Sequence, residues 1–181
     1  MSMSLHVFEN NSRCPYTGMI VKTEPGWNYQ GRQGGFCVDI SRVGESIMYV
    51  QASGYADTHD QIKSLELHKK MSLSEFSTSR PYVQIQNWKG LKGATREARQ
   101  LYIDYLKNNK QLLALYFCNI SFMLRMSIKL GKRLNLVPFP VNIVDDYPAA
   151  VQKAASLLNA ANLDAASPPP VRRSRWRSRP S

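Results

Sequence analysis

The hydrophobic positions of the chain alternate between short runs typical of strands and longer stretches with helical spacing. Residues 36–40 and 47–55 are two apolar runs on either side of a turn at Gly44, which predicts a β-hairpin. Residues 82–86 alternate apolar and polar side chains with period two, as in a half-buried strand. Residues 112–118 are apolar throughout, as in a central strand covered on both faces. Residues 141–144 predict a final strand.

Four helices are expected between and after these strands. The first begins at Asp57 or Thr58 and runs to about Met71, and the last runs from Tyr147 to about Ala161. Two more follow residues 94 and 121, and each has one apolar face at 100° per residue. Those two faces consist of Ala94, Ala98, Leu101, Tyr102 and Tyr105, and of Phe122, Met123, Met126, Leu130 and Leu134. The predicted order β-β-α-β-α-β-α-β-α indicates an α/β fold with a mixed, mostly parallel sheet and covering helices.

The pattern divides the chain into three parts. Residues 1–33 read as an irregular N-terminal arm that packs through Tyr16, Trp27 and Tyr29. Residues 34–163 form the predicted α/β domain. Residues 164–181 are rich in proline and arginine and have almost nothing to bury, so we expect a disordered tail.

Charge is distributed unevenly over these parts. The chain carries 24 basic and 13 acidic residues, a net charge of +11. Residues 1–87 are neutral in sum, whereas residues 88–136 hold 10 basic and 2 acidic side chains and the tail holds five arginines. The folded part of the excess therefore lies in one stretch, which favours an acidic partner surface or a bound anion there over nucleic acid.

Several classes of function lack their signature in the chain. The longest apolar run has seven residues, too few for a membrane span, and the N-terminus does not read as a secretory signal. Cys14, Cys37 and Cys118 have neither metal-ligand nor disulfide-framework spacing, which favours a reducing cytoplasm. No catalytic, nucleotide-binding or metal motif is present. We therefore expect a cytoplasmic protein that is not an enzyme and needs no cofactor or metal.

Local sequence adds a family resemblance to this element order. Residues 81–88, PYVQIQNW, and residues 93–99, GATREAR, resemble a block in STAS domains of bacterial regulatory proteins. Residues 115–117, 127–134 and 143–147 resemble the rest of that block. The resemblance covers roughly residues 34–158 and implies an anti-sigma-factor-antagonist-like domain of the kind that accompanies PAS sensor, histidine kinase or phosphatase modules. Its implied partner is a protein of the sensor-kinase, phosphatase or sigma-regulatory type.

The chain departs from the family at one functional position. Antagonist STAS proteins carry a phosphoacceptor serine after the third strand, at the start of the next helix. Here the corresponding stretch, residues 87–95, offers only the hydroxyl of Thr95. Thr95 is therefore the candidate phosphoacceptor, and an ordinary helix N-cap is the alternative.

The same stretch is the predicted contact surface. Residues 87–93 read as a glycine-containing loop that leads into a helix N-terminus, where backbone N–H groups bind anions. Polar residues after the next strand and the basic face of the following helix lie near it in the expected fold. The candidate partner- or anion-binding residues are Asn87, Trp88, Lys89, Lys92, Thr95, Arg96, Asn119, Ser121, Arg125 and Lys129.

These observations favour a non-catalytic regulatory module of bacterial signal transduction that acts by protein–protein contact. One alternative is a nucleic-acid or anionic-surface binder that uses the arginine-rich tail and the basic helix face at residues 125–133. A further alternative is a small-molecule sensor with a pocket at the carboxyl edge of the strands.

Overall fold

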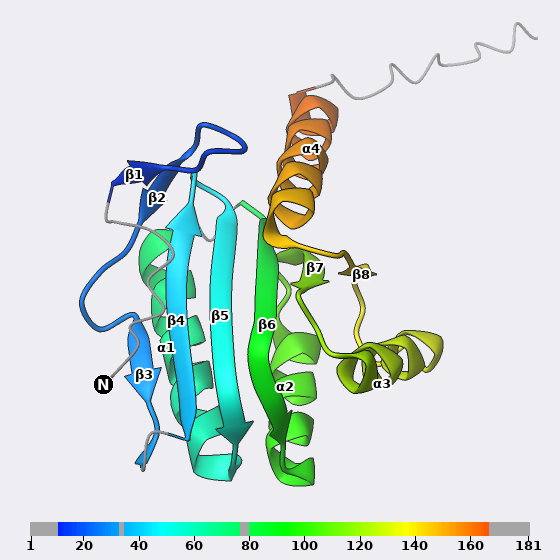
Figure 1. Ribbon diagram of the computed structural model, residues 1–181. Coiled ribbons are helices and arrows are strands. Elements are labelled where there is room, and N and C mark those ends of the chain that lie inside the picture. The colour runs from blue at the N-terminus through cyan, green and yellow to red at the C-terminus, as the bar shows by residue number, and fades with distance from the viewer. Residues whose placement is uncertain (1–10, 33–34, 77–79, 167–181) are drawn as a thin grey trace, which may run out of the picture.

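The computed structural model describes residues 11–32, 35–76 and 80–166, with side chains up to residue 161. Its described part contains one mixed sheet and four helices (Figure 1). The strands are β1 Ser12–Arg13, β2 Ile20–Lys22, β3 Asn28–Gln30, β4 Phe36–Val43, β5 Ile47–Ala56, β6 Tyr82–Ala94, β7 Leu112–Cys118 and β8 Val141–Ile143. The helices are α1 Thr58–Glu75, α2 Arg96–Asn108, α3 Phe122–Arg133 and α4 Tyr147–Ala166.

The sheet joins an antiparallel half to a parallel half. Its order is β1-β2-β4-β5-β6-β7-β8, and β3 pairs with β4 beside β2. Pairs from β1 to β5 are antiparallel, whereas β5, β6, β7 and β8 run parallel. The predicted hairpin is β4–β5, and its turn holds Gly44 at a φ of 62°, a conformation that glycine adopts without strain. The predicted order of strands and helices from residue 36 onward is confirmed.

Helices cover both faces of the sheet. Helices α1 and α2 pack on one face, with Met71 and Leu106 in its apolar core. Helix α4 packs on the other face through Ala150, Val151 and Ala154. Figure 1 shows α1 and α2 behind the sheet and α3 at its β7–β8 end.

The segment expected to be an irregular arm contains strands. Within the described residues before β4, β2 and β3 each pair with β4 and extend the sheet. The aromatic packing expected there is present, since Trp27 is 5% exposed in the core and Tyr16 makes an edge contact with Tyr147. These strands have only two or three residues each, too short for hydrophobic period alone to reveal.

The prediction of a loop at residues 87–93 is wrong, because β6 continues to Ala94. It pairs with β5 from Val83 to Ala94, and two register shifts place extra β6 residues opposite the partner strand. The glycines serve this pairing rather than a turn. A Cβ on Gly90 would lie 2.7 Å from the Ser53 Cβ, and Gly93 has a φ of 149°. Glycine within a strand thus marks bulges and close backbone approach here.

Candidate functional site

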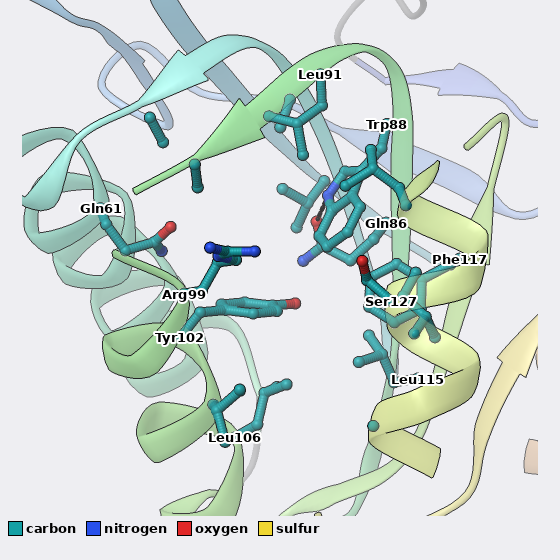
Figure 2. A pocket seen from close by; sticks show the side chains of 18 of the residues that line it. Gln61, Gln86, Trp88, Leu91, Arg99, Tyr102, Leu106, Leu115, Phe117 and Ser127 are labelled. Carbon is teal, nitrogen blue, oxygen red and sulfur yellow. Dashed lines mark hydrogen bonds between the residues drawn. The ribbon is translucent and has the colours of Figure 1, made fainter. Parts of the chain in front are cut away.

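A cavity of about 210 Å³ lies between the sheet and the helices on the α1–α2 face. Strands β5, β6 and β7 form its floor, α1 and α2 form one wall, and α3 with the segment after it forms the other (Figure 2). Most of its lining is apolar, including Val50, Leu106, Leu115, Phe117 and Ile128. An engineered apolar cavity of about 150 Å³ holds benzene, so this one has room for a larger apolar group.

Polar side chains at one side of the cavity satisfy one another in a chain of hydrogen bonds. The Trp88 indole N–H donates to Gln86 Oε1 at 3.0 Å, and Gln86 Nε2 lies 3.5 Å from His68 Nε2. The His68 Nδ1–H donates to the Ser64 carbonyl oxygen at 2.7 Å, which fixes the tautomer because a carbonyl only accepts. Burial lowers the pKa of His68 to about 4, so the imidazole is neutral at pH 7.

Two side chains of α2 remain without such partners. The Tyr102 hydroxyl is buried and has no hydrogen-bond partner among the described residues. Burial raises the pKa of Tyr102, so the hydroxyl keeps its proton at neutral pH. Arg99 lies one turn earlier, forms no ion pair with any described residue, and lines the same cavity. Figure 2 shows both side chains reaching into the cavity from α2.

The outer surface of α3 is unusually apolar for an exposed helix. No residue of α3 is fully buried. Its inner side carries Leu124 and Ile128, which line the cavity, and Ile128 is also partly buried against the core of the α1–α2 face. The apolar face expected from the helical period points outward. We call this set of residues the α3 stripe, and it consists of Phe122 (73% exposed), Met123 (73%), Met126 (50%), Leu130 (57%) and Leu134 (61%).

Basic residues border the α3 stripe on one side. Lys129, Lys132 and Arg133 are exposed, and Arg125 forms an ion pair with the exposed Asp145 at 3.5 Å. No acidic residue occurs in α3 itself. At 100° per residue Arg125, Lys129 and Lys132 lie beside one edge of the stripe, and Arg133 falls just inside that edge. Of the residues predicted for a contact surface, Arg125 and Lys129 therefore lie together on this helix.

Other predicted residues lie on the opposite face of the sheet. Neighbouring β6 residues point to opposite faces, so Asn87 separates from Trp88. Asn87 is 6% exposed, donates to the Tyr49 hydroxyl at 2.7 Å, and accepts from Asn119 Nδ2 at 3.2 Å. Asn87 and Asn119 are thus brought together, as part of the packing on the α4 side. Ser121 caps α3, since its hydroxyl accepts from the Leu124 N–H at 3.4 Å.

The remaining predicted residues lie in the second half of β6 and at the start of α2. Thr95 is the N-cap of α2, and its hydroxyl accepts from the Ala98 N–H at 3.1 Å. Lys89, Lys92 and Arg96 are exposed. Trp88 is half-buried over Phe117, with ring centroids 4.4 Å apart, and lines the cavity. Phosphorylation of Thr95 stays a prediction, and the arginine-rich tail lies outside the described residues.

The sequence did not reveal the cavity, whose residues come from eight helices and strands and the segment after α3. For Arg99 and Tyr102 the sequence indicates one relation, because a spacing of three residues places both on the same side of α2. Within the described ranges no group of three or more His, Cys, Asp or Glu side chains is placed to hold a metal ion. In the same ranges, no helix has the combined length and hydropathy that crossing a bilayer requires.

Comparison with known proteins supports the fold. No protein-family model matches the chain, and no curated protein matches it. The fold is similar to the crystal structure of an uncharacterized protein of the DUF3478 family from Shewanella loihica PV-4, described as having a SpoIIAA-like fold. The TM-score is 0.51 at 14% sequence identity, and the match covers 72% of this chain and 98% of that one. The STAS-like α/β architecture expected from the sequence is thereby confirmed.

Proposed function

We propose that the protein is a cytoplasmic regulatory module of bacterial signal transduction, which acts by protein–protein contact and catalyses no reaction itself. The observation that carries this proposal is the exposed α3 stripe with its basic border. Large exposed apolar patches on folded domains mark interaction sites, and charges at their edge select the partner. The partner surface is an apolar groove or patch lined by acidic residues along one side. A SpoIIAA-like fold fits such a role.

Two other occupants of the α3 stripe fit it less well. A second copy of the chain brings its own basic border close, and like charges disfavour that contact. A helix that lies in a lipid interface turns a polar face to water opposite its apolar face. In α3 the side opposite the stripe carries Leu124 and Ile128 and lines the cavity. An acidic protein surface brings no like charge against the basic border and does not require a polar face opposite the stripe.

The test is site-specific photocrosslinking in native lysate, with the crosslinking residue at Met126 and, as the control, at Leu73. Leu73 is 77% exposed on α1 and lies outside the stripe. Charge reversal by Lys129→Glu with Arg133→Glu is compared with Lys153→Glu, an exposed lysine of α4. We expect one protein to crosslink from position 126 alone, through a peptide with an acidic excess. Reversal on α3 abolishes the crosslink, and Lys153→Glu leaves it intact.

Three results contradict the proposal. The first is a crosslink from position 126 to a second copy of the chain. The second is binding of anionic vesicles or of nucleic acid that is lost on charge reversal of α3 and occurs without a protein crosslink. The third is a protein crosslink that is insensitive to reversal on α3, because the basic border would then play no part in recognition.

A further inference from the structure

We propose that the cavity beneath α3 binds a small organic anion with an apolar body, whose acidic group is held by Arg99 and Tyr102. This inference concerns a different surface from the α3 stripe and does not depend on the proposed protein contact. It assigns the cavity a ligand class, an aryl or medium-chain alkyl carboxylate.

The apolar body follows from the lining. Side chains such as Val50, Leu115, Phe117, Leu124 and Ile128 line the cavity of about 210 Å³. Ligand pockets combine such a lining with a few polar groups that fix orientation. The volume suits one aromatic ring system or an alkyl chain of medium length, judged against the roughly 150 Å³ that holds benzene.

The negative charge follows from which polar groups are left over. Gln86, His68 and Trp88 already satisfy one another, and His68 is neutral. The cavity is lined by two cationic side chains, Arg99 and Lys132, and by no carboxylate. A cationic ligand would therefore meet only like charge there, whereas an anion gains attraction.

The unpartnered Tyr102 hydroxyl supplies the second observation. A buried hydroxyl without a hydrogen-bond partner destabilises the fold, and native structures rarely retain one without a role. The hydroxyl is fully protonated, so it donates to a carboxylate oxygen in the cavity. Arg99 lies one helical turn away on the same side of α2 and offers several N–H donors to that acid group.

The experiment compares three probes of equal chain length by calorimetric titration of the full chain. They are octanoate, 1-octanol and octylamine, with 2-naphthoate as a second, aromatic anion. We expect octanoate or 2-naphthoate to bind at least tenfold more tightly than octylamine, with 1-octanol between them. NMR shifts on binding should concentrate at the lining residues Leu115, Leu124 and Ile128.

Matched variants then test the two α2 side chains. Arg99→Gln should weaken binding of the anion about tenfold and leave 1-octanol unchanged. Lys107→Gln removes the same charge from the same helix, outside the cavity, and should have no effect. Tyr102→Phe should weaken anion binding while stabilising the free protein, because it removes an unpartnered buried hydroxyl. Tyr105→Phe is its control, since the Tyr105 hydroxyl accepts from Asn109 and does not line the cavity.

Three outcomes would overturn the assignment. One is that neither anion binds at millimolar concentration. Another is that octylamine binds as tightly as octanoate, which removes the argument from charge. The third is that Arg99→Gln and Lys107→Gln weaken the anion equally, since the effect would then come from net charge and not from the cavity.

Discussion

Helices α2 and α3 share the same general sequence pattern but are placed differently in the fold. Both are short and amphipathic, both begin at a hydroxyl N-cap, and both end near basic residues. Helix α2 turns Ala98 and Leu106 into the core, whereas the apolar stripe of α3 faces outward. An apolar helix face therefore does not by itself indicate whether the helix turns that face into its own domain. Experiments that treat the two helices identically should separate these cases.

The largest difference is expected for a matched pair of leucine truncations. Leu106 is 4% exposed and Leu130 is 57% exposed. Leu106→Ala removes core contacts and should lower the free energy of unfolding by about 3 kcal/mol. Leu130→Ala should change it by less than about 0.5 kcal/mol, because the side chain is already in water. Urea denaturation measures both, and a loss for Leu130→Ala equal to that for Leu106→Ala would show that α3 packs inward in solution.

The stability of the fold should depend on pH through His68, a buried residue of α1. The folded-state pKa of His68 is lowered from 6.5 to about 4 by burial, so the fold keeps the imidazole neutral while the unfolded chain takes up a proton. Above pH 6.5 His68 does not change the free energy of unfolding. As the pH drops from 6.5 toward 4, that free energy falls, because the unfolded chain gains a proton that the folded chain does not. The loss approaches about 3 kcal/mol at pH 4.

Denaturation of His68→Gln across pH 4–7 tests this dependence. Over that range the free energy of unfolding of the variant should decrease much less than that of the unaltered protein. His59→Gln is the matched control on the same helix, since His59 is exposed. Superimposable pH profiles for the unaltered protein and His68→Gln would mean that His68 titrates normally in the fold.

The smallest contrast concerns the two N-caps. Thr95→Ala should cost about 1 kcal/mol, the usual value for losing a cap hydrogen bond. Ser121→Ala should cost less, because its bond is longer, at 3.4 Å against 3.1 Å, and α3 contributes little buried surface. Thermal unfolding of the two variants resolves the order. A larger effect at Ser121 would indicate that α3 matters more to global stability than its packing suggests.

Much of the fold was predictable because local signals agreed with tertiary packing. The uniform apolar run at residues 112–118 is the parallel strand β7, and Asp57 and Thr95 are caps as their residue types suggest. The end of β6 was not predictable in the same way. Gly90 and Gly93 read as turn residues, whereas they permit bulged pairing with β5, a strand distant in sequence.

The candidate site was predictable only in part. Of the basic residues in the charge excess at residues 88–136, Arg125 and Lys129 lie together on α3, and their role in binding stays a prediction. Period alone could not choose which apolar side of α3 faces the sheet, since Leu124 and Ile128 compete with the α3 stripe. Strand alternation placed Asn87 and Trp88 on opposite faces, which a loop assignment had hidden. The cavity depends on how α3 rests over the sheet, and no local pattern encodes that placement.

The two walls of the cavity are attached to the sheet in different ways. Strand β6 runs directly into α2 through Thr95, whose N–H donates to the Ala56 carbonyl at 3.0 Å, so α2 has almost no connecting segment. Helix α3 is connected through Asn119, at a φ of 53°, and through a longer segment, residues 134–140. We therefore expect a ligand to enter and leave the cavity when α3 is displaced, while α2 stays in place. A protein bound to the outer surface of α3 would then slow this displacement and so lower the dissociation rate of a ligand in the cavity. Binding on the two sides of α3 would be coupled through that rate, without a change in the structure of either site.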